Sequence, residues 1–360
     1  MRKKSVLLIV MMFALTSLLT INAQEKKKLI GDYLSISGWM NIQYDYESQL
    51  QNGGESLDVI ANTFNVRRAR LDFKGNLCEN VEFRVQGDLA GNPKLVDGFV
   101  KVKLQKYFNI QVGQFKIPFT FENPQSPLTL EGIEYAQVIS KLSGYSDISG
   151  VKTYSGGRDV GVMIYGDLFS FERNGKEIPI LTYKLGVFNG NGMNNKDANL
   201  AKDIAGSIEV CPGVKGLMLA TSYYNGNYYL NDDVRNALRN RLTFGGKYEN
   251  GRLTVRSEYI MGDTEMAKGE EIYTLESDGF YVTGGYWFNI MKGQRIRPVA
   301  RYDFFRQDVH NPEKNSTYYM VGIDWWPYKN LRLLVNYTMK DKPGFDYMGN
   351  LWQAQLSVKF

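Results

Sequence analysis

Apolar and polar residues alternate along almost the whole chain, and this period of two constrains the fold more than any other feature. At the C-terminus, Leu356, Val358 and Phe360 share one face, and Ser357 and Lys359 share the other. Successive side chains of a β-strand point to opposite faces of the sheet. The pattern therefore predicts strands that each have one apolar and one polar face.

Sixteen segments of the chain show this alternation, and most are 9–13 residues long. A tilted transmembrane strand needs about 9–11 residues, whereas strands of soluble proteins most often have about five or six. The lengths therefore favour strands that cross a bilayer. The predicted strands are 33–47, 63–74, 81–90, 95–104, 107–115, 158–168, 178–188, 202–211, 215–225, 239–248, 252–261, 279–289, 295–306, 316–326, 330–340 and 349–360.

The connections between these strands alternate in length, with 91–94 as the exception. Long loops on one side, short turns on the other and an even strand count are typical of an outer-membrane barrel with both termini in the periplasm. A large β-sandwich would not keep this asymmetry over sixteen strands, and a solenoid would show a short repeat, which we do not find. We predict an all-β fold, a 16-stranded antiparallel transmembrane β-barrel. Its long connections are 48–62, 116–157, 189–201, 226–238, 262–278, 307–315 and 341–348.

The composition agrees with a barrel in a membrane. Mean hydropathy is −0.33 although 13% of the residues are aromatic, because lipid-facing and water-facing residues alternate. Tyrosine and tryptophan are typical of the two membrane interfaces. Trp39 departs from the pattern, since it falls on the polar face of its strand. The predicted aromatic belts include Tyr223, Tyr224, Tyr318, Tyr319, Trp325 and Trp326.

The N-terminus has the pattern of a secretory signal peptide. Arg2, Lys3 and Lys4 precede an apolar stretch, and Ala23 is a small residue at a plausible cleavage point. The alternative, a retained anchor, would require a longer apolar run. We predict a signal peptide at 1–23 and a single outer-membrane barrel domain at 24–360. Removal of 1–23 lowers the formal charge from +5 to +2, which gives no reason to expect a nucleic-acid partner.

The connection 116–157 is by far the longest in the chain. A loop of that length is usually functional, and a sixteen-stranded barrel is wide enough to hold a water-filled channel. We predict that this third extracellular loop folds inward and narrows the lumen. The alternative is a disordered surface loop.

Several short motifs carry a resemblance to a known family. The segment 112–119 (VGQFKIPF), followed by Glu122, resembles the entry to the third loop of the phosphate-selective porin O and P family. Segments 134–136 (EYA) and 157–161 (GRDVG) resemble the later part and the exit of that loop. The segments 67–71, 188–192 and 297–303 also fit, and the resemblance spans essentially the whole mature chain. It implies a sixteen-stranded porin, commonly trimeric, that passes small anions such as phosphate.

The polar faces of the predicted strands carry more cations than anions. Strand parity places sixteen lysines and arginines and ten acidic residues toward the lumen. Basic rings in a pore favour anions, and arginine holds carboxylate or phosphate through its planar fork. The alternative is structural, because ion pairs on neighbouring strands can brace the wall and cancel. The pore-lining candidates, from the strands, the loop and its exit, are Arg68, Arg70, Arg84, Lys101, Lys103, Lys116, Arg158, Arg297 and Arg301.

Two departures weaken a strict preference for phosphate. The loop carries more acidic than basic residues, and Ser207 stands where the family resemblance implies an arginine. We therefore expect an outer-membrane porin for passive diffusion of small hydrophilic solutes with a weak anion preference. A plugged surface-binding or adhesion barrel and an outer-membrane hydrolase are the alternatives.

The chain shows no enzyme or cofactor signature. His310 is the only histidine and lies in a predicted outer loop, whereas general-base chemistry most often relies on histidine beside a nucleophile. We find no metal-ligand cluster and no phosphate-cradling glycine loop. Cys78 and Cys211 fall at separate predicted turns, so we expect free thiols. We predict no enzyme activity, no catalytic residue, no metal and no cofactor.

The last residue, Phe360, ends an alternating strand. This pattern resembles the signal read by the barrel assembly machinery of the bacterial outer membrane, although it is equally that of an ordinary last strand. The expected partners are therefore outer-membrane lipid, small anions, the assembly machinery and two further copies of the chain in a homotrimer.

Overall fold

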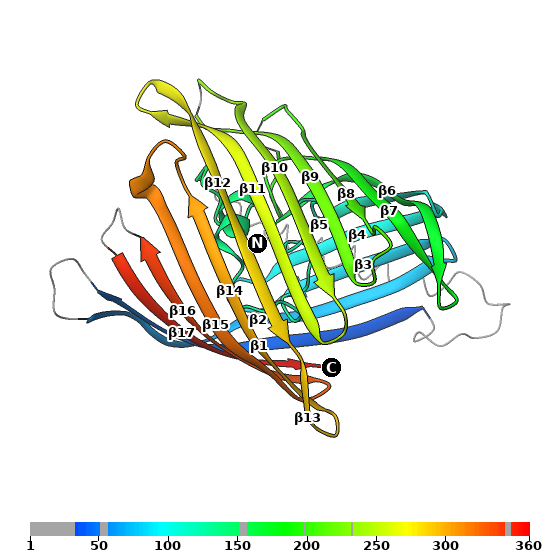
Figure 1. The fold of residues 1–360 in the computed structure, drawn as a ribbon. Coiled ribbons are helices and arrows are strands. Elements are labelled where there is room, and N and C mark those ends of the chain that lie inside the picture. Colours follow the sequence, from blue (N-terminus) through cyan, green and yellow to red (C-terminus); the bar gives the residue numbers. More distant parts are fainter. Residues whose placement is uncertain (1–32, 51–56, 151–156, 198, 232, 343–346) are drawn as a thin grey trace, which may run out of the picture.

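The protein is an antiparallel sheet that closes on itself (Figure 1). A computed structural model describes residues 33–50, 57–150, 157–197, 199–231, 233–342 and 347–360, and the predicted signal peptide lies outside them. The strands are β1 (Leu34–Leu50), β2 (Leu57–Cys78), β3 (Val81–Asp88), β4 (Lys94–Gln105), β5 (Phe108–Lys116), β6 (Arg158–Arg173), β7 (Lys176–Phe188), β8 (Asp203–Val210), β9 (Leu217–Tyr228), β10 (Ala237–Glu249), β11 (Leu253–Lys268), β12 (Glu271–Tyr286), β13 (Phe288–Met291), β14 (Gln294–Arg306), β15 (Asn315–Tyr328), β16 (Leu331–Lys342) and β17 (Tyr347–Lys359).

Closure gives a barrel of sixteen strands, which confirms the predicted fold class. β12 and β13 both pair with β14, so they are one barrel strand interrupted at Trp287. The described helical elements are α2 (Gln137–Leu142) and the 3-10 turn η2 (Pro312–Lys314). None of the helices in the described part of the chain is long and apolar enough to span a membrane.

The barrel is polar inside and apolar outside. On β1, Asn41 and Gln43 are buried, while their neighbours Met40 and Ile42 are 36% and 37% exposed. On β15, Asp324 is fully buried and Ile323 is 45% exposed. A soluble protein shows the opposite distribution, whereas a barrel in lipid turns its apolar side chains outward.

The first and last strands form the seam that closes the barrel. β1 pairs with β17 from Trp39 opposite Lys359 to Leu50 opposite Met348. At its end, Phe360 exchanges backbone hydrogen bonds with Gly38 in both directions. A Cβ on Gly38 would lie 2.3 Å from the Phe360 ring, so only glycine allows the aromatic ring to lie there.

Two of the predicted long connections are shorter in the structure. β11 and β12 continue to Lys268 and Glu271, so the predicted loop 262–278 is a two-residue turn at one end of a long hairpin. β2 begins at Leu57 and covers the end of the predicted connection 48–62. The β11–β12 extension carries polar residues on both faces, so backbone pairing rather than apolar alternation maintains it. The β2 extension 57–62 (LDVIAN) is mostly apolar. The loop-length asymmetry is therefore weaker than predicted.

A β-bulge in β2 changes which arginines face inward. Asn41 pairs with Arg68 and Ile42 pairs with Val66, so Arg67 has no partner of its own. An extra residue of this kind shifts the alternation of the strand by one. Arg67 therefore joins Arg68 on the inner side, where strict parity predicts only one of them.

The predicted aromatic belts are partly wrong. Tyr223 and Tyr319 are 47% and 43% exposed, as lipid-facing residues should be. Tyr224 is buried and donates a hydrogen bond to Asp203. Trp326 lines a crevice with the buried residue Arg332 and faces inward. Adjacent residues of a strand point to opposite faces, so only one member of each such pair can meet lipid.

Candidate functional site

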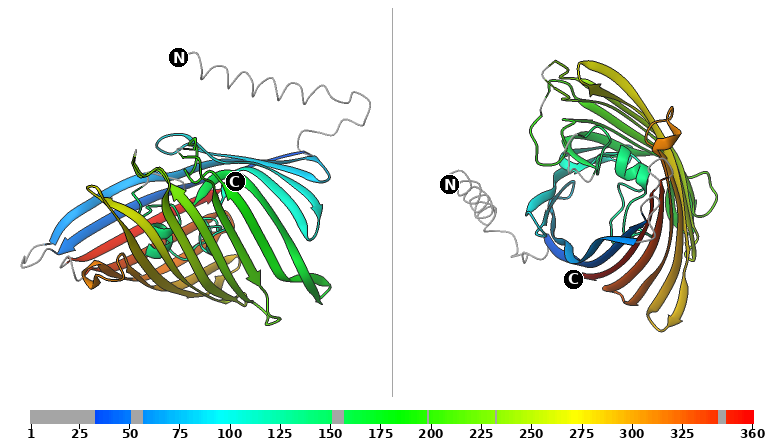
Figure 2. Two further views of the ribbon diagram at one scale, coloured as in Figure 1. Left: turned by 90° about the horizontal axis from the view of Figure 1, so that it is seen from above. Right: turned by 90° about the vertical axis from the view of Figure 1, so that its left-hand side faces the viewer.

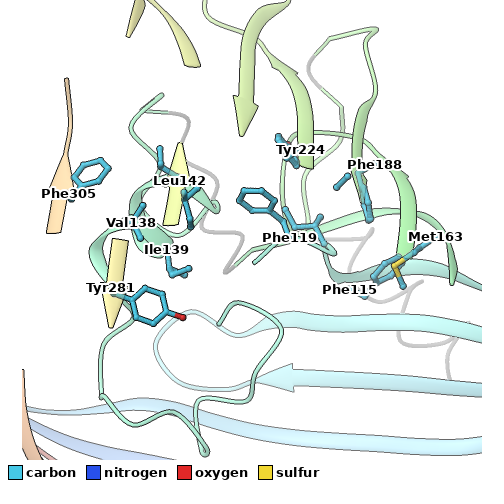
Figure 3. Packing of buried hydrophobic residues seen from close by; sticks show 14 residues of the cluster. Phe115, Phe119, Val138, Ile139, Leu142, Met163, Phe188, Tyr224, Tyr281 and Phe305 are labelled. Carbon is cyan, nitrogen blue, oxygen red and sulfur yellow. The ribbon is translucent and has the colours of Figure 1, made fainter. Parts of the chain in front are cut away.

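The connection between β5 and β6 lies against the inner wall, and α2 lies inside the ring of strands (Figure 2). Its apolar side chains form the principal buried cluster with residues of β11, β12 and β14 (Figure 3). Because these side chains leave water together, their burial stabilises the loop against the wall. The cluster includes Phe119, Val138, Ile139, Leu142, Ile260, Tyr281 and Phe305.

Polar contacts fix the loop to β11 as well. The Glu258 carboxylate accepts backbone hydrogen bonds from Phe121 and Glu122, and Arg256 lies 2.6 Å from Glu131. Glu131, Arg256 and Glu258 are all buried. Buried charges are tolerated where they are paired and hydrogen-bonded. These contacts therefore position the loop and also compensate its buried charges.

Arginines of β14 and β16 hold the loop on its other side. Arg332 donates hydrogen bonds to the carbonyls of Leu128 and Leu130 at 3.0 and 2.5 Å. Arg297 contacts Glu131 at 3.2 Å, and Arg301 donates to the Glu134 carbonyl at 2.8 Å. The predicted pore-lining candidates Arg297 and Arg301 thus lie under the loop, only 4% and 7% exposed.

The middle and the exit of the loop are also fixed by close contacts. Arg67 makes a bidentate ion pair with Glu134. Gly157 has a φ of +66°, and a Cβ there would lie 2.2 Å from Asn123, whose amide donates to the Gly157 carbonyl. Glycine is therefore required where the loop returns to β6.

The Asp147 carboxylate gives the loop an anchor that resists acid. It is buried and lies 3.5 Å from Arg241 of β10. Burial alone would raise the pKa of Asp147, but the charges of Arg241 and Arg239 hold its pKa below the ordinary value of 3.8. A lowered folded-state pKa stabilises the fold above the unfolded-state pKa and is lost as pH falls through the folded-state value.

We therefore expect Asp147→Asn to lower the free energy of unfolding by the same amount at about pH 7 and about pH 5, with the difference vanishing only below about pH 3. Denaturant unfolding of the detergent-solubilised protein at each pH measures it. A difference that disappears between pH 7 and 5 would contradict the anchor.

The loop leaves a cavity of about 270 Å³ against β1–β8. The cavity lining contains five cations and two carboxylates, a net charge of +3. The carboxylates are already engaged, since Asp97 pairs with Arg84 and Arg158, and Glu209 pairs with Lys184. The five cations are Arg70, Arg84, Lys116, Arg158 and Lys184.

Four of the predicted candidates therefore meet at this one cavity, although they come from different strands and from the loop entry. Lys116 donates hydrogen bonds to the carbonyls of Asn123 and Gln125 at 2.5 and 2.6 Å. It has no carboxylate within ion-pair distance in the described part of the chain. Arg70 pairs with Asp88 at 3.1 Å, and Arg84 pairs with Asp72 at 2.8 Å.

A second cavity of about 410 Å³ adjoins the first and shares Arg84 and Phe99 with it. Lys101 lines it, 5.5 Å from the Phe99 ring. Lys103, in contrast, forms an ion pair with Glu82 and lines neither cavity. The structure thus places Lys101 and Lys103 in different environments although parity treats them alike.

Arg68 lies between the bulge and the cavity. One of its terminal nitrogens, Nη1, is buried with no hydrogen-bond partner in the residues that the structure describes. Its neighbours Arg67 and Arg70 are also cationic, so the local charge is positive along this stretch of β2. The carboxylates of Glu134 and Asp88 already pair with Arg67 and Arg70.

Two features of the cavity are harder to read from the sequence. Lys184 lines it although it is not among the predicted candidates, and its inward parity was the available signal. Ser207 also lines the cavity, directly opposite Lys184 in the β7–β8 register. The position at which the family resemblance implies an arginine therefore belongs to the cavity wall.

The pair between Arg158 and Asp97 should be important for stability. Both side chains are buried, 2.6 Å apart. Removing one partner of an isolated buried pair costs about 3–5 kcal/mol, but Asp97 would keep Arg84 at 3.0 Å. We therefore expect Arg158→Met to lower the unfolding free energy by no more than the lower end of that range, about 3 kcal/mol, and Arg158→Met combined with Asp97→Leu to restore most of the loss, as measured by denaturant unfolding in detergent. Equal losses in the single and double variants would contradict this role.

The one histidine of the chain and its two cysteines lie in different places. His310 has a 73% exposed side chain, 3.4 Å from Glu276, in the β14–β15 connection. Within the described residues, no three His, Cys, Asp or Glu side chains are placed to hold a metal ion. Cys78 and Cys211 are free thiols.

Comparison with known proteins places this geometry in context. The barrel is similar to the anion-selective porin from Comamonas acidovorans, with a TM-score of 0.63 and 10% identity over 91% of this chain and 99% of that one. It is similar to the outer-membrane channel DcaP of Acinetobacter baumannii, with a TM-score of 0.64 and 14% identity over 92% and 99%. It is also similar to the trimer form of OmpT of Vibrio cholerae, with a TM-score of 0.54 and 11% identity over 91% of this chain and 100% of that one. At these identities the likeness establishes the fold.

The sequence itself identifies the family. A comparison with curated proteins found no significant match. The family model of the phosphate-selective porin O and P matches residues 39–343, which include every predicted pore-lining candidate and the loop 116–157. Family and fold together indicate an outer-membrane channel rather than an enzyme. The chain belongs to the phosphate-selective porin O and P family.

Proposed function

We propose that this porin passes small hydrophilic solutes by passive diffusion with a weak preference for anions. The net charge of +3 around the 270 Å³ cavity carries the proposal. Fixed positive charge in a narrow passage lowers the electrostatic barrier for anions and raises it for cations. The similarity to a channel named as an anion-selective porin agrees with this preference.

The preference is weak because most of the wall charge is already compensated. Arg70, Arg84, Arg158 and Lys184 all have carboxylate partners. The serine at position 207 leaves the β8 side of the cavity without the arginine that the family resemblance implies. Phosphate is therefore one of several small anions that we expect to pass, rather than an exclusive substrate.

We also propose the arrangement of the protein in the cell. Residues 1–23 direct export. The loop 116–157 forms the constriction of the single barrel domain 24–360. The short turns of the barrel face the periplasm, and the long loops face the outside. Family membership and the trimer form of OmpT support a homotrimer. Phe360 is 72% exposed at the seam, where the assembly machinery could reach it.

The reversal potential in a KCl gradient tests the function. Purified protein in a planar lipid bilayer should give a potential of the sign expected for chloride permeating faster than potassium. Addition of phosphate should reduce the chloride current only slightly. A potential of the opposite sign would refute the anion preference, and the absence of any current would favour a plugged barrel.

A further inference from the structure

A row of cations and indole rings lies on the inner wall at the barrel end that holds the C-terminus. Arg70 lies 5.0 Å from the Trp39 ring, and Trp39 is the register partner of Lys359. Lys359 lies 5.2 Å from the Trp326 ring. We call this row the Trp–cation track. It continues through Arg295 and ends at Trp287.

Arg295 connects the last two rings of the track. Its guanidinium carbon lies 5.1 Å from the Trp326 ring, its register partner on β15, and 4.3 Å from the Trp287 ring. Arg297, two residues after Arg295 on β14, lies 4.4 Å from the same Trp287 ring. The track thus crosses β2, β1, β17, β16, β15, β14 and the β12–β13 junction (Figure 1).

The usual reason for tryptophan in a membrane barrel does not apply to these rings. Interfacial tryptophans face lipid headgroups, but Trp39 shares its face with the buried residues Asn41 and Gln43. Trp326 lies beside the buried residue Arg332. Aromatic surface that faces an aqueous lumen gains nothing from lipid, so its partners must come from the wall or from a solute.

Two cations of the track have no carboxylate to neutralise them. Arg295 is exposed, and neither it nor Lys359 lies within ion-pair distance of an acidic residue in the described chain. In contrast, Arg332 and Arg297 both pair with Asp324. Arg295 and Lys359 are therefore available to an anion, and they lie 5.1 and 5.2 Å from the Trp326 ring.

We propose that Trp326, Arg295 and Lys359, with Trp287, form a binding site for planar aromatic anions. The aromatic ring of the ligand stacks on an indole, and its carboxylate pairs with Arg295 or Lys359. The crevice between Trp326 and Lys359 measures only about 10 Å³, so the lysine must move from the indole to the carboxylate. Its flexible stem allows that movement, and a cation–aromatic contact at a partly exposed site is weak.

The site goes beyond the general anion preference, because it selects for a flat ring as well as for charge. Stacking of a flat ring on an aromatic side chain is a recurrent source of affinity. An aliphatic carboxylate has no such face to offer. The track therefore adds chemical discrimination at a point away from the 270 Å³ cavity, whose lining includes only Trp39 and Arg70 of the track.

Equilibrium binding to the full-length protein in detergent tests the proposal without requiring conduction. Saturation-transfer NMR titrations should show that benzoate binds at least about tenfold more tightly than cyclohexanecarboxylate or acetate. Trp326→Leu and Arg295→Gln should each weaken benzoate about tenfold. Trp325→Leu is the matched control, since that tryptophan lies on the opposite face of β15, and it should leave benzoate binding unchanged.

Equal binding of benzoate and cyclohexanecarboxylate would overturn the proposal, and so would wild-type affinity in both Trp326→Leu and Arg295→Gln. If Trp326→Leu does not give a heat-modifiable folded band on a gel, Arg295→Gln decides the question. A channel without anion preference could still bind benzoate, so failure of the proposed function would not be mistaken for failure of this site.

Discussion

A variant that lacks residues 121–149 will conduct at least about twice the current of the intact channel in symmetrical KCl. The deletion removes α2 and the apolar cluster that it forms with Ile260, Tyr281 and Phe305. A sixteen-stranded wall encloses a wide lumen unless a loop fills part of it. Single-channel recording in planar bilayers measures the increase.

The deletion needs a control because it also exposes buried charges of the wall. Arg256 and Arg297 lose Glu131 as a partner, so folding should first be verified by heat-modifiable migration. Removal of residues 308–313, a segment that contains part of η2 and no buried residue, is the matched control. It should leave conductance unchanged. Equal conductance in the intact and 121–149-deleted channels would show that the loop is not the constriction.

Replacing Lys101 and Lys116 together by glutamine will reduce the chloride-to-potassium permeability ratio by about fivefold, and replacing both by glutamate will give a cation-preferring channel. Both lysines line cavities, and neither has a carboxylate within ion-pair distance in the described chain. Their charge is therefore not cancelled locally. Two unit charges about 4 Å apart interact with an energy of about 1 kcal/mol even at the dielectric constant of water. Each lysine can therefore change the energy of a permeating ion that passes at this distance. Reversal potentials measure the ratio.

The matched control is Lys106→Gln. Lys106 lies in the short turn between β4 and β5, pairs with Glu177 and lines neither cavity, so its loss should leave the ratio within about 20% of the wild-type value. The change in permeability ratio caused by replacing Lys101 and Lys116 should also decrease as ionic strength rises, because salt screens exposed charge. An unchanged ratio in the double glutamate variant would mean that selectivity originates elsewhere in the lumen.

The strands could be predicted because each has one face in lipid and one face in water. On β1 and β17 the alternation follows directly from lipid on one side and water on the other. The rule fails where a strand leaves the membrane, as at the β11–β12 hairpin, because polar residues on both faces resemble a loop. It also fails at the bulge beside Arg67, where one extra residue changes the parity.

The site was less predictable because it depends on contacts between distant parts of the chain. Arg84 and Arg301 are equivalent in strand parity, yet Arg84 lines a cavity and Arg301 lies beneath the loop. The difference arises from the path of residues 117–150 along the inner wall, which no periodicity of the sequence predicts. The same path decides that Lys116, at the entry of the loop, reaches the cavity.

The seam between β1 and β17 sets the order of events when the protein is made. Its register runs over twelve residue pairs and joins the first strand to the last. Until β17 has been synthesised, the first strand has no partner along one edge, and lipid cannot hydrogen-bond those backbone groups. Insertion of a growing chain strand by strand would therefore leave two open edges in the bilayer. Synthesis of β17 must therefore precede closure, so the earlier strands have to be kept from assembling until then.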